Sequence, residues 1–167
     1  MTLWSTIASP LGDLLLVGER TDGQVTLTSL SMPGGRNTPA VRSDWLHDPE
    51  ALADVSRQVA AYFAGELTRF DIRFTPTGTD FQQRVWRALE DIPFGTSTTY
   101  GELAEQLGVP RQGIQAVGAA IGANPLLLVR PCHRVIGADG TMRGYAAGVE
   151  RKVWLLTHEG VLQPTLL

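Results

Sequence analysis

Cysteine, lysine and histidine are all scarce in this chain of 167 residues, which has one cysteine, one lysine and three histidines. A single cysteine, Cys132, cannot close a disulfide within the chain, so the fold must be held together by its core. The histidines, His47, His133 and His158, lie far apart, which argues against a structural Cys/His zinc site with its closely spaced ligands. The sequence therefore predicts neither a disulfide scaffold nor a metal site.

Long hydrophobic runs and a basic leader are also missing. The first residues, Met1 to Ile7, carry no positive side chain and no extended apolar stretch, so we predict no signal peptide and no transmembrane helix. A free thiol suits a reducing compartment. We therefore expect a cytoplasmic protein with no membrane partner.

An excess of positive charge is absent too, because the net charge is −3. This value argues against a general polyanion binder. The acidity belongs to residues 1–78, with 6 basic and 9 acidic side chains, whereas residues 79–167 hold 8 of each. Thirteen of the fourteen basic residues are arginine, which suits planar hydrogen bonding to phosphates and bases. Such a bias is equally a feature of GC-rich genomes, so it only suggests nucleic acid.

The first half of the chain has the pattern of a small α/β unit. Short β-prone runs at residues 4–7, 13–17 and 25–31 are separated by turn residues and predict an antiparallel meander, followed by a loop at 32–43. One more strand is expected at 70–74.

The same half contains one expected helix. Asp48-Pro49-Glu50 resembles an N-cap, a first-turn proline and an early acid, and predicts a helix that ends at Gly65. Its expected buried face consists of Leu52, Val55, Val59 and Phe63. Residues 75–78, with proline and glycine, indicate a boundary between two units.

The second half is predicted to be mainly helical. Thr79–Gln82 and Thr99–Glu102 have the pattern of capping boxes and predict two helix starts. Pro110 is expected to begin a third helix that ends near Ile121, with Gly122 just beyond it. The second and third helices form a helix-turn-helix candidate, and a last helix is expected at 150–158. The small residues of the third helix allow close approach of either a DNA groove or a neighbouring helix.

Cys132 lies in the run Arg130-Pro131-Cys132-His133-Arg134. Pro131 fixes its own φ, while His133 offers a base and Arg134 a positive field that favours thiolate over thiol. The motif therefore indicates a nucleophile, although free cysteines are often inert core residues.

From Thr79 onward the chain resembles the methylated-DNA–protein-cysteine methyltransferase family, also called O6-alkylguanine-DNA alkyltransferases. The motifs that carry this resemblance occur in the family's order and spacing: Phe81–Trp86, Thr99–Ala104, Asn124-Pro125, Pro131–Gly137, Gly144-Tyr145 and Leu155–Gly160. The resemblance implies an α+β fold. A ribonuclease-H-like α/β domain with a small antiparallel sheet (residues 1–77) would precede a winged-helix-like domain with a helix-turn-helix (residues 78–167).

The family's reaction implies a role for each matching residue. The thiolate of Cys132 would take the alkyl group from O6 of a guanine flipped out of duplex DNA. His133 would accept the thiol proton through a water, and Glu159 would orient His133. Asn124 would order the segment that carries the thiol, and Tyr100 would donate to the leaving guanine. Without the resemblance, Asn124 is also a turn residue before Pro125, and Tyr100 an aromatic residue at a helix start.

The resemblance also implies two contact surfaces. The residues expected around the flipped base are Tyr145, Val135, Ala146 and Ile121. The residues expected to contact DNA are Gln115, Arg111, Gly113, Ala116 and Arg134. As a bare sequence feature, Tyr145 is an ordinary loop aromatic.

Two positions depart from the family pattern. Gln115 stands where most relatives carry an arginine that inserts into the base stack, and the preceding turn is one residue longer, so Arg111 is a candidate to replace that contact. Arg130 stands where relatives have a branched apolar residue. Its charge would either lower the Cys132 pKa, reach phosphate, or form a structural ion pair.

The predicted function is direct DNA repair by stoichiometric, irreversible alkyl transfer to Cys132, without a cofactor or metal and with O4-alkylthymine activity left open. The expected partner is double-stranded DNA containing O6-alkylguanine. We expect a monomer in solution and leave cooperativity on DNA open. The alternatives are a cysteine hydrolase, which would turn over, and a non-repairing alkylguanine-binding protein, whose known forms lack the cysteine.

Overall fold

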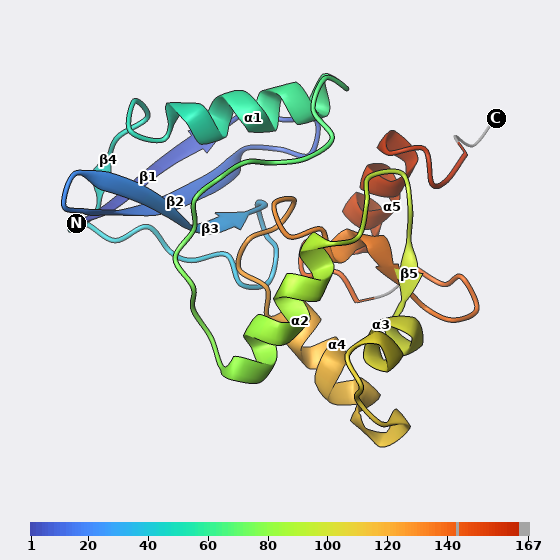
Figure 1. Ribbon diagram of the computed structural model, residues 1–167. Coiled ribbons are helices and arrows are strands. Elements are labelled where there is room, and N and C mark those ends of the chain that lie inside the picture. The colour runs from blue at the N-terminus through green and yellow to red at the C-terminus, as the bar shows by residue number, and fades with distance from the viewer. Residues whose placement is uncertain (143, 164–167) are drawn as a thin grey trace. The chain divides into compact units, whose positions relative to one another are not determined.

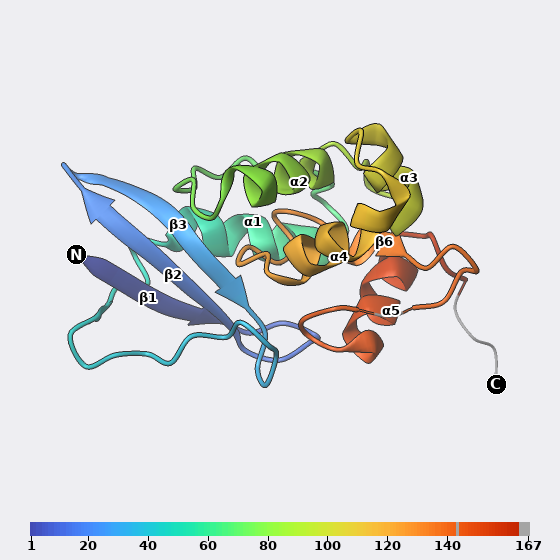
Figure 2. The ribbon, with the colours of Figure 1, turned by 90° about the horizontal axis from the view of Figure 1, so that it is seen from below.

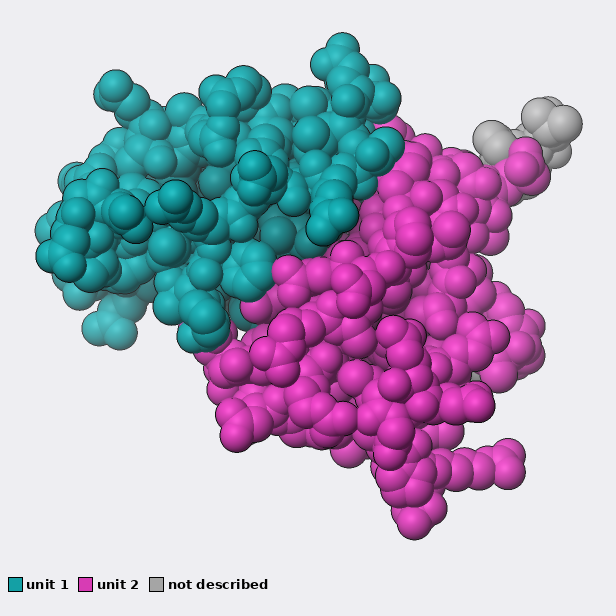
Figure 3. All heavy atoms as spheres, viewed as in Figure 1, with its two compact units in different colours: residues 1–76, 125–129 teal, residues 77–124, 130–167 magenta. Residues whose placement is uncertain are grey.

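The computed structural model describes residues 1–142 and 144–163 and divides into two compact units (Figures 1 and 3). Unit 1 comprises residues 1–76 with 125–129, and unit 2 comprises residues 77–124 with 130–167. Arg143 and residues 164–167, which belong to the predicted second domain, lie outside the described residues. An α+β fold with a small N-terminal sheet and a mainly helical second half is confirmed.

Unit 1 is built on a four-stranded sheet in the order β3-β2-β1-β4. Strands β1 (Thr2–Ile7), β2 (Leu14–Thr21) and β3 (Gln24–Ser31) form the predicted antiparallel meander. Leu16 of β2 pairs with Leu30 of β3, and both side chains are fully buried. Strand β4 (Leu46–His47) pairs parallel to β1 and was not predicted, since two residues give no readable alternation.

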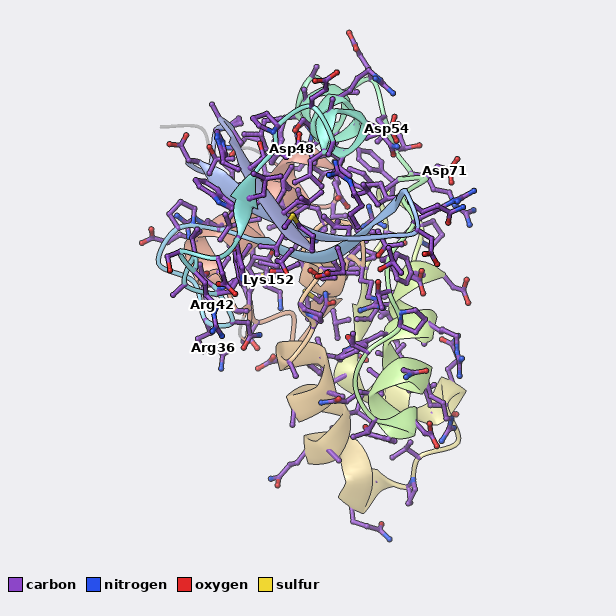
Figure 4. All side chains as sticks on the ribbon, turned by 90° about the vertical axis from the view of Figure 1, so that its left-hand side faces the viewer. Arg36, Arg42, Asp48, Asp54, Asp71 and Lys152 are labelled. Atoms are coloured by element: carbon purple, nitrogen blue, oxygen red, sulfur yellow. The ribbon has the colours of Figure 1, made fainter. Side chains whose placement is uncertain are left out.

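Helix α1 (Ala53–Phe63) covers one face of this sheet (Figures 1 and 2). The predicted start was wrong, because Asp48 Oδ1 accepts the N–H of Ala51 at 3.0 Å and so caps a turn that precedes the helix. The predicted face was wrong at its end, where Tyr62 is buried in place of Phe63. Asp54 remains on the exposed side of α1 (Figure 4) and pairs with Arg57.

The predicted strand at residues 70–74 does not form. Only Phe74 bridges to Leu27, where the Leu27 N–H donates to Arg73 O at 2.9 Å and the Thr75 N–H donates to Leu27 O at 3.2 Å. Residues 125–129 also join the edge of β3, because Leu30 exchanges backbone hydrogen bonds with Pro125 O and the Leu127 N–H at 2.9 and 3.1 Å. The chain therefore leaves unit 2 after Asn124 and returns to it at Arg130.

Within its described residues, unit 2 contains four α-helices: α2 (Asp80–Glu90), α3 (Tyr100–Gln106), α4 (Ile114–Gly122) and α5 (Val149–His158). Both predicted capping boxes are present at Thr79 and Thr99. Helices α2 and α3 each pack against α4, and α3 with α4 forms the helix-turn-helix (Figure 1). None of the helices within the described ranges is long and apolar enough to cross a membrane.

The start of α4 differs from the prediction. A short 3₁₀ turn (Arg111–Gly113) precedes it, and Pro110 caps that turn in an extended conformation with φ −65° and ψ 161°. Gly122 was expected just beyond the helix but is its last residue. Its φ is not positive, so it does not end the helix in a left-handed conformation. The φ of proline suits both a helix start and an extended cap, and the sequence does not distinguish them.

A pair of two-residue strands links distant parts of unit 2. Strand β5 (Thr98–Thr99) runs parallel to β6 (Val135–Ile136), with Thr99 opposite Ile136. Because β5 leads directly into α3 and β6 follows Cys132 closely, this pair sets Tyr100 beside the cysteine segment. The pairing was not predicted, since each strand is too short to show a pattern.

The capping box of α2 provides a stability test. Replacing Thr79 with Ala removes the side chain that accepts the Gln82 N–H at 3.1 Å, and we expect the free energy of unfolding to fall by about 1 kcal/mol. Thr79→Ser keeps the hydroxyl and should stay near wild type. Urea denaturation measures both, and equal losses in the two variants would contradict the capping role.

Candidate active site

Cys132 lies in a turn that the preceding proline shapes. Pro131 has φ −78° and ψ 64°, the conformation of an inverse γ-turn. The Cys132 N–H accordingly donates to Arg130 O at 2.7 Å. A 3₁₀ turn (Cys132–Arg134) follows and leads into β6. Proline favours this turn because its ring already holds φ near the required value.

Asn124 closes the loop that ends at this turn. Its side chain is buried, and Nδ2 donates to Arg130 O at 3.1 Å. Asn124 and Arg130 are the last and first residues of unit 2 on either side of residues 125–129. The amide therefore ties together the two ends of that excursion. The Asn124 amide also hydrogen-bonds to the Cys132 side chain and lowers its pKa.

His133 and Glu159 form a fully buried pair. His133 Nε2 lies 2.7 Å from Glu159 Oε2, and neither side chain is exposed. Burial raises the pKa of Glu159, but hydrogen bonds from His133 and Arg134 outweigh it and lower the pKa to about 2. Glu159 is therefore a carboxylate, so Nε2 is the donor. Burial lowers the pKa of His133, which favours neutral imidazole.

The second imidazole nitrogen is the one that remains available as a base. His133 Nδ1 is buried and has no hydrogen-bond partner among the residues that the structure describes. With the proton on Nε2, Nδ1 carries the lone pair. The pair thus presents a neutral base whose tautomer Glu159 fixes.

Arg134 holds the other side of the same carboxylate. Its Nε and Nη2 donate to Glu159 Oε1 and Oε2 at 2.7 and 3.1 Å, and Nη1 donates to Ile92 O at 2.6 Å. The side chain is only 7% exposed. The expected contact between Arg134 and DNA must therefore be withdrawn, because its guanidinium faces the interior and is engaged there. A bidentate pair of this kind fixes the carboxylate in position as well as neutralising it.

Cys132 is the only cysteine in the chain, and its thiol is buried. Burial raises its pKa to about 11, although the Asn124 hydrogen bond and the positive charge of Lys152 both act to lower it. The expectation that His133 and Arg134 create a field favouring the thiolate was wrong, since burial outweighs the neighbouring charges. The sulfur therefore needs a base before it can attack.

Lys152 is a site residue that the sequence analysis missed. This lysine of α5, labelled in Figure 4, is 0% exposed. Its Nζ lies 5.8 Å from the centre of the Tyr100 ring. Burial lowers the pKa of Lys152 to about 8, whereas the negative charge of the Cys132 thiolate raises it. The sequence held one signal for it: Lys152 is the single lysine among thirteen arginines, on the helix that ends just before Glu159.

Tyr100 and Tyr145 each lie close to a residue of the site. A Cβ added to Gly144 would lie 2.7 Å from Tyr100 Oη, so the Gly144 backbone passes close to that hydroxyl. Gly144 has φ +76°, which favours glycine. The Tyr145 ring is buried, and its centroid lies 6.3 Å from that of His133 at an interplanar angle of 74°. Tyr145 thus lies near His133, and Tyr100 lies near Lys152 and Gly144. Their expected contacts with guanine stay predictions.

The other predicted residues divide into a buried set and an exposed set. Val135, Ala146 and Ile121 are buried. Arg111, Gln115 and Ala116 are exposed at the start of α4, with Gly113 half-buried beside them. Among the described residues, no hydrogen bond or ion pair links Arg111, Gln115 or Ala116 to Cys132.

Arg130 is buried rather than directed to solvent. Its exposed fraction is 3%, and its Cζ lies 4.7 Å from the centre of the Trp86 ring. A desolvated cation–π contact contributes about 2 kcal/mol. Burial lowers the pKa of Arg130, and Glu90 on α2 raises it. The ion pair with a carboxylate stays a prediction, since the negative charge of Glu90 raises the Arg130 pKa without establishing a direct contact. The causes that shift the Cys132 pKa do not include Arg130.

Sequence comparison agrees with the geometry over nearly the whole chain. A family model described as "6-O-methylguanine DNA methyltransferase, ribonuclease-like domain" matches residues 2–76, and one described as "6-O-methylguanine DNA methyltransferase, DNA binding domain" matches residues 80–161. The chain belongs to the methylated-DNA–protein-cysteine methyltransferase family. This membership confirms the predicted family and fold class.

Individual relatives of this methyltransferase family cover the chain almost completely. It is 46% identical to a methylated-DNA–protein-cysteine methyltransferase of Mycolicibacterium paratuberculosis, over 100% of this chain and 98% of the relative. A methyltransferase of the same name from Methanosarcina acetivorans is 42% identical, over 94% and 97%. The crystal structure of Mycobacterium tuberculosis OGT in complex with DNA has a TM-score of 0.83 and 46% identity, over 95% of this chain and 93% of that one.

Metal chemistry has no candidate site in residues 1–142 and 144–163. No group of three or more histidine, cysteine, aspartate or glutamate side chains in these ranges could hold an ion.

The Glu159 carboxylate should make stability depend on pH. Its folded pKa of about 2 lies below the ordinary 4.5, so its contribution is complete above pH 4.5 and is lost as the pH falls toward 2. We expect Glu159→Gln to lower the free energy of unfolding at pH 7 by about 3 kcal/mol.

Chemical denaturation at a series of pH values measures this effect. Glu150→Gln, which changes an exposed carboxylate of the same helix, is the control and should change stability by less than about 0.5 kcal/mol. An acid transition in Glu159→Gln as steep as that of wild type would contradict the assignment.

Proposed function

We propose that this protein repairs DNA directly, by irreversible transfer of the alkyl group from O6-alkylguanine in duplex DNA to Cys132. The observation that carries the proposal is a buried cysteine beside a neutral histidine whose tautomer is fixed by a carboxylate. The family of the chain and the DNA complex of its relative support it. Each molecule acts once, because the product is a stable thioether.

The reaction follows from the order of the groups. His133 Nδ1 takes the thiol proton through a water, and the sulfur forms a bond to the alkyl carbon while the bond from that carbon to O6 breaks. The electron pair of the broken bond goes to the guanine, which takes up a proton to become the normal base. Overall, the thiol proton is exchanged for the alkyl group, so no cofactor is required.

Neighbouring groups stabilise the charges that form in this reaction. The Asn124 amide and the Lys152 ammonium stabilise the developing thiolate, since both lower the Cys132 pKa. The Tyr100 hydroxyl, which lies near Gly144, is proposed to donate a proton to the departing guanine. Arg134 acts through Glu159 and is a positioning residue.

We propose that one set of residues encloses the flipped base and that another set contacts the DNA duplex. Tyr145, Val135, Ala146 and Ile121 are proposed to enclose the flipped guanine, since an extrahelical base needs flat and apolar walls. Gln115, Ala116 and Gly113 are proposed to face DNA from α4, with Arg111 supplying the positive charge that Gln115 lacks. We propose a monomer in solution, with residues 1–77 as the N-terminal domain and 78–167 as the catalytic and DNA-binding domain.

Intact-mass measurement tests the proposal. After mixing with duplex DNA containing O6-methylguanine, wild type should gain the mass of one methyl group, and Cys132→Ser should gain none. Since Cys132 is the only cysteine, the modified thiol is identified at once. Unchanged mass together with repeated turnover of an ester or amide substrate would instead indicate a cysteine hydrolase.

The role of Lys152 is tested by the pH dependence of the thiol. Below about pH 8 Lys152 is charged, so Lys152→Met removes a positive charge and should raise the Cys132 pKa further. We expect the alkyl-transfer rate at neutral pH to fall about tenfold, which corresponds to about one pKa unit. Titration of thiol reactivity with a small alkylating reagent measures the pKa.

Arg151→Met is the matched control, because it removes a positive charge from the adjacent residue of α5, which is not among the groups that shift the Cys132 pKa. Its titration curve should coincide with wild type. If the Lys152→Met curve coincided as well, Lys152 would have no part in activating the thiol.

A further inference from the structure

Arg130 has two separate connections to helix α4. Its carbonyl oxygen accepts Asn124 Nδ2 at 3.1 Å, two residues after the end of α4. Its guanidinium stacks on Trp86, whose Nε1 donates to Ala120 O of α4 at 2.8 Å in the interior. Main chain and side chain of one residue thus join the cysteine turn to the same helix.

The cysteine turn depends on the same residue. Arg130 O also accepts the Cys132 N–H at 2.7 Å, so the position of residue 130 sets the position of the sulfur. Its side chain is 3% exposed, which excludes direct contact with phosphate. Glu90, one turn after Trp86 on α2, adds negative charge near the guanidinium. Position 130 is therefore buried and carries a charged arginine, although an uncharged apolar side chain could occupy the same position.

We propose that Arg130 is a positioning residue that holds Cys132 in register with helix α4. This inference rests on the proposed alkyl transfer and on α4 as the helix that contacts DNA. Bound duplex fixes the place of a flipped base relative to α4, whereas the Arg130 turn fixes the place of the sulfur. The two must agree closely, because a displacement of about 1 Å can slow a reaction about a hundredfold.

A free base gives a different expectation. O6-methylguanine that is not part of DNA makes no contact through α4 and can adjust its own position to the sulfur. Loss of register should therefore slow transfer from duplex DNA and leave transfer from the free base unchanged. A residue that only supports the fold would affect both substrates alike.

The experiment compares single-turnover rates of Arg130→Leu and wild type on both substrates, with DNA at saturating concentration. We expect the rate with duplex DNA to fall by about tenfold or more and the rate with the free base to stay within about twofold of wild type. Arg87→Leu, which removes an exposed arginine of α2, is the control and should keep the wild-type ratio. An unchanged ratio in Arg130→Leu, or equal losses on both substrates, would overturn the inference.

Trp86→Phe provides a second variant should Arg130→Leu fail to fold. It keeps an aromatic face under the guanidinium and removes the N–H that reaches Ala120 O. The same selective loss with duplex DNA is expected. Where Arg130→Leu folds, the two losses should not add in the double variant, because both changes remove one connection. A wild-type ratio in Trp86→Phe would contradict the side-chain connection. Failure of wild type on both substrates would instead reject the alkyl transfer itself.

Discussion

The site depends on one buried negative charge, the carboxylate of Glu159. A carboxylate in the interior is costly unless its charge and its lone pairs are matched. Arg134 supplies the opposite charge in a bidentate pair, and His133 supplies one further donor. Both partners come from the 3₁₀ turn that begins with Cys132. Satisfying Glu159 therefore also fixes the segment that carries the nucleophile.

The same arrangement explains how a buried thiol can be both protected and reactive. Burial keeps Cys132 protonated, and burial keeps His133 neutral. Because Arg134 already neutralises Glu159, the histidine remains a neutral base whose orientation is set. Proton transfer from sulfur to His133 is then a local event between adjacent residues, with the positive charge of Lys152 available to stabilise the product thiolate.

Local sequence patterns were reliable where the physics is local. The meander, both capping boxes and the last helix depend on neighbouring residues, and they were predicted. The strand at residues 70–74 failed because strand formation needs a partner edge, and β3 is bridged there only at Leu27. The strands β5 and β6 were missed because two residues are too few to show an alternation. These strands are nonetheless what brings Tyr100 beside the cysteine segment.

The sequence alone determined the family, the nucleophile and the groups around it other than Lys152, since ordered motifs such as Pro131–Gly137 are specific to this chemistry. Tertiary structure alone decided which charges are buried. It turned Arg134 inward to Glu159, placed Arg130 on Trp86 and brought the single lysine near enough for its charge to lower the pKa of the thiol. Residue type states what a side chain can donate or accept, but burial and partners, which arise only on folding, decide its charge and its role.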